Sequence, residues 1–200
     1  APGPDVLESS VFCEYVGIRR RQDRGYTVAH GQLLDHFLTP STLRFSMIFL
    51  PALIKEFGSL RVSIGKEFLD EWRTPKAWDL DKPSPFETTR ILNPEPNKKL
   101  IDEARERLGI AFPALKGIEF VESWAGMVET TPDVIPVIDQ SPIRGFFIAT
   151  GFSGHGFGIG PGAGKAAAEL LRGDTPSVNI GALTLSRFSD GTPIRPQKTI

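Results

Sequence analysis

The sequence predicts an α+β fold with a large mixed, mostly antiparallel sheet and a few helices. Three observations lead to this fold class. Runs rich in β-branched and aromatic residues outnumber runs with helical periodicity. Turn-forming residues separate most of these runs, and only two or three stretches carry a helical pattern.

The composition is that of a globular chain long enough to bury a core. Of its 200 residues, 40% are hydrophobic and 24% are charged, and the formal net charge of -1 gives no electrostatic argument for binding nucleic acid. The most apolar run, residues 45–54, is too short to span a bilayer. The single cysteine, Cys13, fits a reducing compartment. We therefore expect a cytoplasmic protein without a transmembrane segment, a metal site or a nucleic-acid partner, and the oligomeric state stays open.

The N-terminal part is predicted to be rich in strands. Residues 11–22 and 25–34 form a hairpin in this prediction, because Asp-Arg-Gly between them is a turn signal. Alternation along the first strand places Arg19 and Arg21 on one face. Residues 43–58 are expected to be a strand and then a short helix that ends at Gly58, and residues 60–69 a further strand.

The middle and the end of the chain contain a long connection, one clear helix and further strands. The proline-rich residues 73–97 predict an ordered surface loop. A helix follows at 98–108, with an apolar stripe and Gly109 at its end. Residues 117–139 predict two strands around the Thr-Thr-Pro-Asp turn, 145–151 a buried strand, and 181–194 a last strand.

A glycine-rich loop carries the functional prediction. Seven glycines lie between Gly151 and Gly164, after a strand and before a helix that has Pro161 in its first turn and Gly173 after its last. Such a helix start presents bare N–H groups and about half a positive charge. This arrangement favours an anion or the electron-rich edge of a planar cofactor.

Known phosphate-binding motifs match this loop poorly. The Walker pattern fails because its first glycine is one residue too far from Lys165 and Ala166 replaces the Mg²⁺-binding hydroxyl, so a nucleotide-phosphate enzyme is a weak alternative. Gly158, Gly160 and Ala163 fit a G-x-G-x-x-A variant of the Rossmann fingerprint, but no ribose-binding acid follows at the required distance. A structural interpretation also exists, in which small residues let the helix pack closely on a sheet.

Three segments together resemble the FAD-dependent D-amino acid oxidase family, which includes glycine oxidase, sarcosine oxidase and bacterial D-amino acid dehydrogenases. They are "SWAGMVETTPDVIPVID", "GFFIATGFSGHGFGIGPGAGKAAAELLRG" and "LSRFSDG". The resemblance covers nearly the whole chain. It implies that residues 1–123 belong to a substrate-binding sheet domain and that residues 124–200 are a flavin-contacting segment, with the last strand, loop and helix of the FAD-binding domain.

The resemblance also implies the cofactor site. FAD would lie against the neighbouring strand residues and the glycine loop, namely Trp124, Ala125, Gly126, Gly151, Phe152, Ser153, Gly154, His155, Gly156, Phe157 and Gly158. Two interpretations of His155 stay open, a polar contact near the ring or a loop histidine without a catalytic role.

Two departures from the family pattern change the expected chemistry. Gly126 stands where sarcosine oxidase-like members have a flavin-linked cysteine, so the FAD should be non-covalent. Gly158 stands where they have a substrate-binding lysine, so the substrate carboxylate needs another partner. The candidates are Arg19, Arg21 and Arg90, because an arginine binds a carboxylate through two parallel hydrogen bonds.

The family's N-terminal strand, G-x-G-x-x-G turn and helix do not occur in this sequence. We therefore expect the C-terminal part of a longer enzyme whose missing N-terminal half binds the ADP moiety. Its substrate would be a small amine or amino acid, with hydride passing from the alpha carbon to flavin N5 and the imine hydrolysing in water. The alternative is a non-catalytic binding or assembly subunit of a flavoprotein complex.

Overall fold

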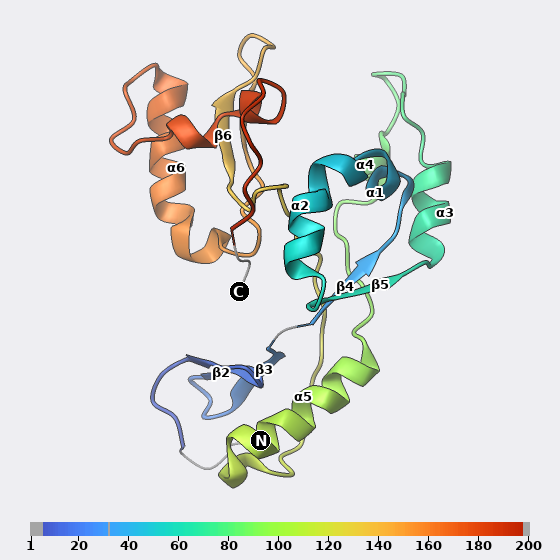
Figure 1. Ribbon diagram of the computed structural model, residues 1–200, viewed down its shortest axis with the longest axis vertical. Helices are drawn as coiled ribbons and strands as arrows, with labels where there is room; N and C mark the ends of the chain where they lie inside the picture. Colours follow the sequence, from blue (N-terminus) through green and yellow to red (C-terminus); the bar gives the residue numbers. More distant parts are fainter. Residues whose placement is uncertain (1–5, 32, 198–200) are drawn as a thin grey trace. The chain divides into compact units, whose positions relative to one another are not determined.

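The computed structural model describes residues 6–31 and 33–197 (Figure 1). The chain divides into two compact units, each described separately below. Unit 1 comprises Ala1–Pro40 and Ser59–Met127, and unit 2 comprises Ser41–Gly58 and Val128–Ile200. The outermost residues of the predicted segments, 1–5 and 198–200, and Gln32 of the predicted hairpin lie outside the described residues.

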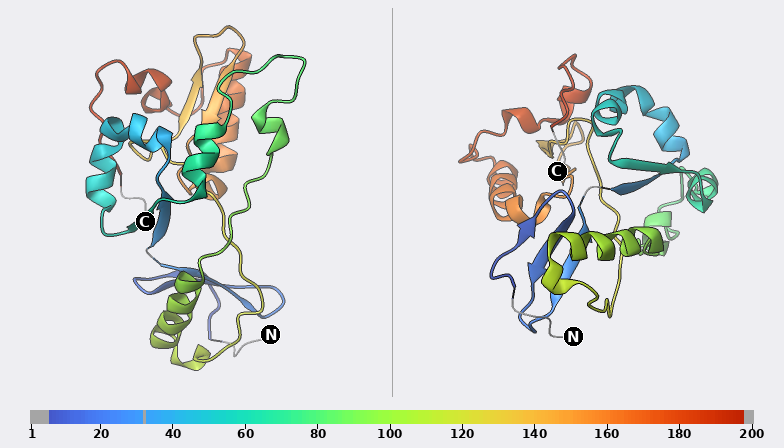
Figure 2. Two further views of the ribbon diagram at one scale, coloured as in Figure 1. Left: turned by 90° about the vertical axis from the view of Figure 1, so that its right-hand side faces the viewer. Right: turned by 60° about the horizontal axis from the view of Figure 1, so that its bottom comes forward.

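Unit 1 contains the predicted hairpin, which is confirmed for β2 and β3, but the strand predicted at 11–22 is divided into two strands that pair with each other. Strands β1 (Val11–Phe12), β2 (Val16–Arg20) and β3 (Tyr26–His30) form an antiparallel sheet in that order. Helix α5 (Lys98–Ala111) covers one face of this sheet (Figures 1 and 2). The core between them is formed by four buried side chains, those of Val16, Ile18, Leu108 and Leu115.

Strand alternation explains this core, because Val16 and Ile18 point to the same face of β2 and meet the apolar stripe of α5. Asn97 is the N-cap residue of α5, and its side chain accepts the Lys99 N–H. It continues through Gly109 to Ala111, so Gly109 does not end the helix as predicted. The 3₁₀ turn η1 (Pro113–Leu115) then brings Leu115 into the core.

The remainder of unit 1 departs from the predicted strands. Strand β4 (Leu34–Phe37) pairs in parallel with β5 (Leu60–Ser63), but α3 (Lys66–Arg73) takes the second half of the strand expected at 60–69. Its apolar residues Phe68, Leu69 and Trp72 have helical rather than alternating spacing. The predicted loop at 73–97 contains one short helix, α4 (Pro85–Thr88).

Unit 2 contains the glycine loop. Strands β6 (Val137–Gln140) and β7 (Phe147–Thr150) pair antiparallel, and α6 (Gly156–Arg172) packs against β6 (Figure 2). The unit also includes α2 (Ser46–Glu56), most of α1 (Pro40–Arg44), and the 3₁₀ turns η2 (Gly181–Leu183) and η3 (Leu185–Phe188). The strand predicted at 145–151 is confirmed as β7, but it is not buried as predicted, because its sheet has only two strands and none of its four residues is buried.

The fold is mixed α and β, as predicted, but the prediction of one large sheet was wrong. The described residues form one three-stranded and two two-stranded sheets, one of them parallel. Residues 43–56 are helical throughout apart from Phe45, because Leu, Met and Ala favour helix there. Residues 118–130 carry no strand, and 181–188 form 3₁₀ turns where a strand was predicted.

Candidate functional site

The connection between β7 and α6 has an unusual backbone conformation, which its glycine residues allow. Gly151, Ser153 and Gly154 all have positive φ angles, of 74°, 50° and 83°. At Gly151 a side chain is doubly excluded, because an added Cβ would also collide with the Thr131 methyl group. Three of the first four residues after the strand therefore adopt a conformation that most residues avoid.

Ser153 is the only non-glycine residue of this loop with a positive φ, and its side chain explains why the conformation is held. It is 1% exposed. The hydroxyl donates to the Gly151 carbonyl at 3.1 Å and accepts from the Thr131 N–H at 3.4 Å. Ser153 thus ties the loop to the segment before β6, and any cofactor contact at this position comes from its main chain.

Glu129 holds the start of the loop from outside. Its Oε1 accepts the N–H groups of Gly151 and Phe152, at 2.8 and 3.3 Å, and its Oε2 accepts the Thr150 hydroxyl at 2.8 Å. The Thr150 hydroxyl has the largest effect and lowers the pKa of Glu129 below its usual value. Burial opposes this shift, and the Gly151 and Phe152 N–H groups each add a smaller lowering effect.

A buried ion pair anchors the turn that Ser153 contacts. The Arg187 guanidinium in η3 donates to both carboxylate oxygens of Asp133, at 2.7 and 3.1 Å, and both side chains are less than a tenth exposed. It also donates to the carbonyls of Ile135 and Thr184. Burial raises the pKa of Asp133, but hydrogen bonds from Arg187 and the Ile135 N–H outweigh it, and the pKa is lowered.

The N-terminus of α6 is open. The helix begins at Gly156, earlier than predicted, so Pro161 lies inside it rather than in its first turn. His155 is the N-cap residue, and no side chain caps this end. Within the described part of the chain, the N–H groups of Gly156 and Phe157 have no hydrogen-bond acceptor. Two donors and the positive end of a 17-residue helix dipole are therefore available to a ligand.

Close packing on the sheet does not explain why α6 contains so many glycines. Apart from its two chain neighbours and the nearby backbone of the helix itself, a Cβ added at Gly158, Gly160, Gly162 or Gly164 would meet no described atom within 4 Å. The close packing of α6 on β6 instead uses alanine, with Ala166 only 1% exposed. Small residues at these glycine positions thus leave space that the described chain does not fill.

The remaining predicted cofactor residues are accessible. In unit 2 His155 and Gly154 are exposed, Phe152 is half-buried, and the Phe157 side chain is 100% exposed. Trp124, Ala125 and Gly126 lie in unit 1, in an irregular segment rather than a strand, and the Trp124 side chain is 60% exposed. A Cβ at Gly126 would also meet open space.

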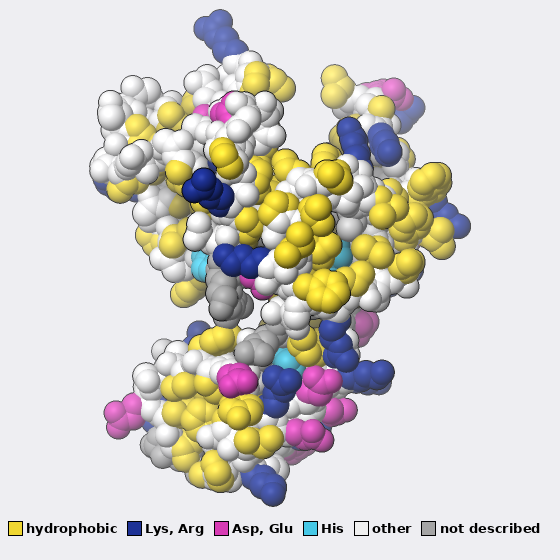
Figure 3. All heavy atoms as spheres, in the orientation of Figure 1, with side chains coloured by type: hydrophobic (Ala, Val, Ile, Leu, Met, Phe, Trp, Pro, Cys, Tyr) yellow, Lys and Arg dark blue, Asp and Glu magenta, His cyan; other side chains and the backbone are white. Residues whose placement is uncertain are grey.

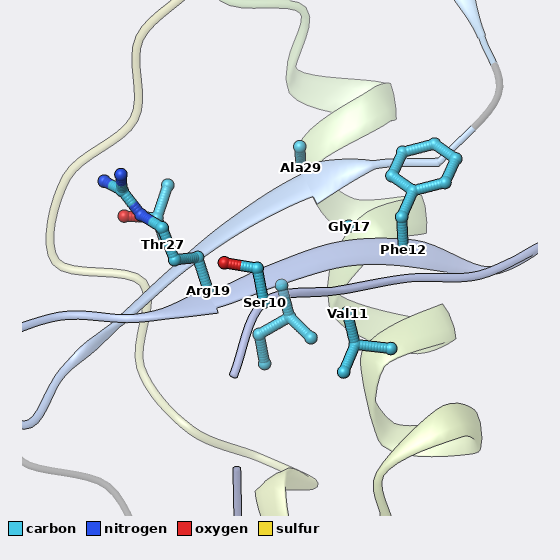
Figure 4. A pocket seen from close by; sticks show the side chains of 8 residues that line it. Ser10, Val11, Phe12, Gly17, Arg19, Thr27 and Ala29 are labelled. Atoms are coloured by element: carbon cyan, nitrogen blue, oxygen red, sulfur yellow. The ribbon is translucent and has the colours of Figure 1, made fainter. Parts of the chain in front are cut away.

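The structure separates the three candidate arginines. Arg19 lies on the face of the β1–β2–β3 sheet opposite α5 and lines a hollow of about 290 Å³ with Phe12, Gly17 and Thr27 (Figure 4). Its guanidinium has no ion-pair partner among the described residues. Arg21 is paired with Asp23 at 3.0 Å, beyond the end of β2. Arg90 is exposed in the irregular segment after α4.

The sequence did not point to Glu129, Asp133 or Arg187 as parts of this site. Glu129 contacts residues 22 positions away, and Asp133 and Arg187 are 54 positions apart. No local pattern marks such pairs. The Thr-Thr-Pro-Asp turn, which ends in Asp133 and directly follows Glu129, is nevertheless a signal that a turn here holds polar partners.

Comparison with known proteins shows the family to which this chain belongs. The chain belongs to the family of FAD-dependent oxidoreductases, whose model, "FAD dependent oxidoreductase", matches residues 17–170. A "D-amino acid dehydrogenase" from Paramagnetospirillum magneticum is 30% identical over 100 residues, which are 50% of this chain and 23% of that protein.

Two solved structures share the fold. An L-amino acid deaminase from Proteus myxofaciens, in complex with anthranilate, superposes with a TM-score of 0.86 over 94% of this chain and 42% of its own, at 26% identity. An L-amino acid deaminase from Proteus vulgaris has a TM-score of 0.80 and 23% identity, over 87% of this chain and 40% of its own. The chain thus spans less than half the length of each of these relatives.

Among the helices formed by residues 6–31 and 33–197, none has both the length and the apolar character needed to cross a bilayer. The same residues contain no group of three or more His, Cys, Asp or Glu side chains that could hold a metal ion.

Proposed function

We propose that this chain is the C-terminal part of an FAD-dependent enzyme that oxidises an amino acid or a related amine. The observation that carries the proposal is the open start of α6. There, the N–H groups of Gly156 and Phe157 have no acceptor among the described residues, and Gly158 and Gly160 leave space that these residues do not fill. When bound, FAD would supply the hydride acceptor, flavin N5, for oxidation at the substrate alpha carbon.

The glycine loop is assigned to cofactor binding through its main chain. The N–H groups of Gly156 and Phe157, with the positive end of the α6 dipole, suit the electron-rich edge of a flavin. They stabilise negative charge there, and such stabilisation favours the reduced cofactor over the oxidised one. Trp124, Ala125 and Gly126 are assigned as the second contact segment, and Gly126 makes the attachment non-covalent, because it offers no thiol.

Arg19 is the candidate we assign to the substrate carboxylate. The relatives are named for amino acids, which carry a carboxylate that a guanidinium binds through two hydrogen bonds. Arg19 lines the hollow on the β1–β2–β3 sheet, and neither Arg21 nor Arg90 belongs to its lining. Arg21 already has Asp23 as its partner, so its charge is partly engaged.

The rest of the enzyme would come from residues outside this chain. Large apolar side chains are exposed on α2, including Met47 and Ile54, and at Phe57 directly after it, and hydrophobic side chains are prominent on this surface (Figure 3). Exposed apolar surface of this kind marks contacts with further protein. We assign residues 1–123 to the substrate side and 124–200 to the flavin side, with the ADP moiety held by the missing N-terminal half.

FAD binding by the full-length protein tests this proposal. Gly156→Leu is compared with Gly58→Leu, because Gly58 also belongs to unit 2 and a Cβ there would meet nothing. We expect Gly156→Leu to abolish FAD binding while Gly58→Leu retains it, with thermal unfolding of the FAD-free proteins measured in parallel. Normal FAD affinity in Gly156→Leu would refute the loop assignment, and a wild-type protein that binds no FAD would favour the assembly subunit instead.

A further inference from the structure

Glu129 makes a set of contacts that the family assignment does not explain. Its carboxylate accepts hydrogen bonds from three consecutive residues, Thr150, Gly151 and Phe152. They span the point at which β7 ends and the glycine loop begins. Glu129 therefore supplies the acceptor that the loop N–H groups lose when strand pairing stops.

The contacts of Glu129 continue to the start of α6. Phe152 donates its N–H to Glu129, and its carbonyl accepts the N–H of His155, the N-cap residue, at 2.8 Å. Phe152 thus links the Glu129 carboxylate to the first turn of the helix through two hydrogen bonds, one from its N–H and one to its carbonyl. Ser153 fixes the other side of the same loop through Thr131.

We propose that Glu129 is a positioning residue for the FAD site, which sets how the free N–H groups of Gly156 and Phe157 are presented. This inference rests on the proposed function. The acceptor is ionised and hydrogen bonds to a carboxylate are stronger than those to a neutral oxygen, so three of them hold the loop more firmly than a main-chain partner would. Glu129 does not need to touch the cofactor to act in this way.

The exposure of Glu129 makes the inference testable. The residue lies at the surface, so truncating it opens no cavity, and we expect the protein to fold. Glu129→Gln keeps an amide oxygen that accepts the Gly151 and Phe152 N–H groups, whereas Glu129→Ala removes every acceptor. The two variants therefore separate the positioning contact from the general effect of changing a surface residue.

Glu169 offers a matched control in the same unit. Its carboxylate also binds several donors, the Lys165 ammonium at 2.8 Å and the Ser177 N–H at 2.7 Å, but towards the other end of α6. Glu169→Ala thus removes a comparable set of hydrogen bonds without touching the glycine loop.

The experiment measures the FAD dissociation constant of the full-length protein by fluorescence titration, with thermal unfolding of each FAD-free variant. We expect Glu129→Ala to weaken FAD binding about tenfold or more, a change of about 1.4 kcal/mol. Glu129→Gln should restore most of the affinity, and Glu169→Ala should bind FAD like the wild type.

Two results would overturn the inference. One is wild-type FAD affinity in Glu129→Ala. The other is an equal loss of affinity and of thermal stability in Glu129→Ala and Glu169→Ala, which would make the effect one of general stability. A wild-type protein without FAD affinity contradicts the proposed function itself, and this outcome is visible before any variant is made.

Discussion

Two regions of the molecule are stabilised in different ways. One is the β1–β2–β3 sheet with α5, and the other is the glycine loop with the residues that hold it. Four apolar side chains, those of Val16, Ile18, Leu108 and Leu115, form the core of the first region. The second region is held by polar groups. Glu129 and Ser153 bind main-chain groups, and Asp133 and Arg187 form an ion pair. Polar contacts specify a backbone path without filling the space beside it, and a cofactor loop requires that space.

The largest effect is expected at the buried ion pair. Arg187→Ala leaves the Asp133 carboxylate buried without its partner, which should lower the free energy of unfolding by about 3–5 kcal/mol. Arg172→Ala is the matched control, because Arg172 also pairs with an aspartate, Asp174, but both side chains are at least half exposed. Its loss should be below about 1 kcal/mol in chemical denaturation. Similar losses in the two variants would contradict the role of the pair as an internal anchor.

The apolar core of the other region should respond through packing. Leu108→Ala removes a side chain that is 1% exposed, and we expect unfolding to become easier by about 2–5 kcal/mol. Ile110→Ala on the same helix truncates a side chain that is 64% exposed, so its effect should stay within about 0.5 kcal/mol. Denaturant titration of both variants checks this, and a large loss in Ile110→Ala would show that α5 has another buried face.

Arg19 sharpens the comparison at the level of function. Arg19→Ala in the full-length enzyme should raise KM for an amino acid about 10- to 100-fold, because a charged, bidentate contact is lost. FAD affinity should not change. Arg21→Ala serves as the control, since Arg21 is paired with Asp23. If steady-state kinetics show the larger loss in Arg21→Ala or Arg90→Ala, the assignment of Arg19 is wrong.

The smallest effect is a pH dependence at the far end of α6. Hydrogen bonds from Lys165 and from the Ser177 N–H lower the pKa of Glu169 from 4.5 to about 2. A carboxyl group with a lowered folded-state pKa stabilises the protein above its unfolded-state pKa. This contribution is lost as the pH falls from about 4.5 to about 2.

Glu169→Gln removes this titration. The difference in thermal stability between the wild type and Glu169→Gln should therefore be present at neutral pH and shrink in acid. A difference that stays constant over the whole range would show that the network does not depend on the charge of Glu169.

Local patterns predicted the elements whose structure depends on neighbours in sequence. The β2–β3 hairpin follows from alternation around the Asp-Arg-Gly turn, and α5 follows from its apolar stripe. Gly173 ends α6 in the left-handed conformation, as a glycine at that position predicts. The glycine loop was also predicted from a local pattern, because glycine is repeated at several of its positions.

Elements that depend on distant partners were predicted less well. Residues 185–188 form a 3₁₀ turn rather than a strand, in which Arg187 reaches Asp133. The β4–β5 pair is parallel, with 22 residues between the two strands, and no turn signal announces such a pairing. The same limit applied to Glu129, whose partners lie far along the chain.

Anaerobic mixing of the full-length, FAD-loaded protein with D-, L- and N-methyl amino acids tests the central claim most directly. The visible absorbance of the flavin reports reduction in a single turnover, before any electron acceptor takes part. We expect at least one of these substrates to bleach the flavin in the wild type. A protein that binds FAD but is reduced by none of them would contradict an amino acid or amine oxidoreductase.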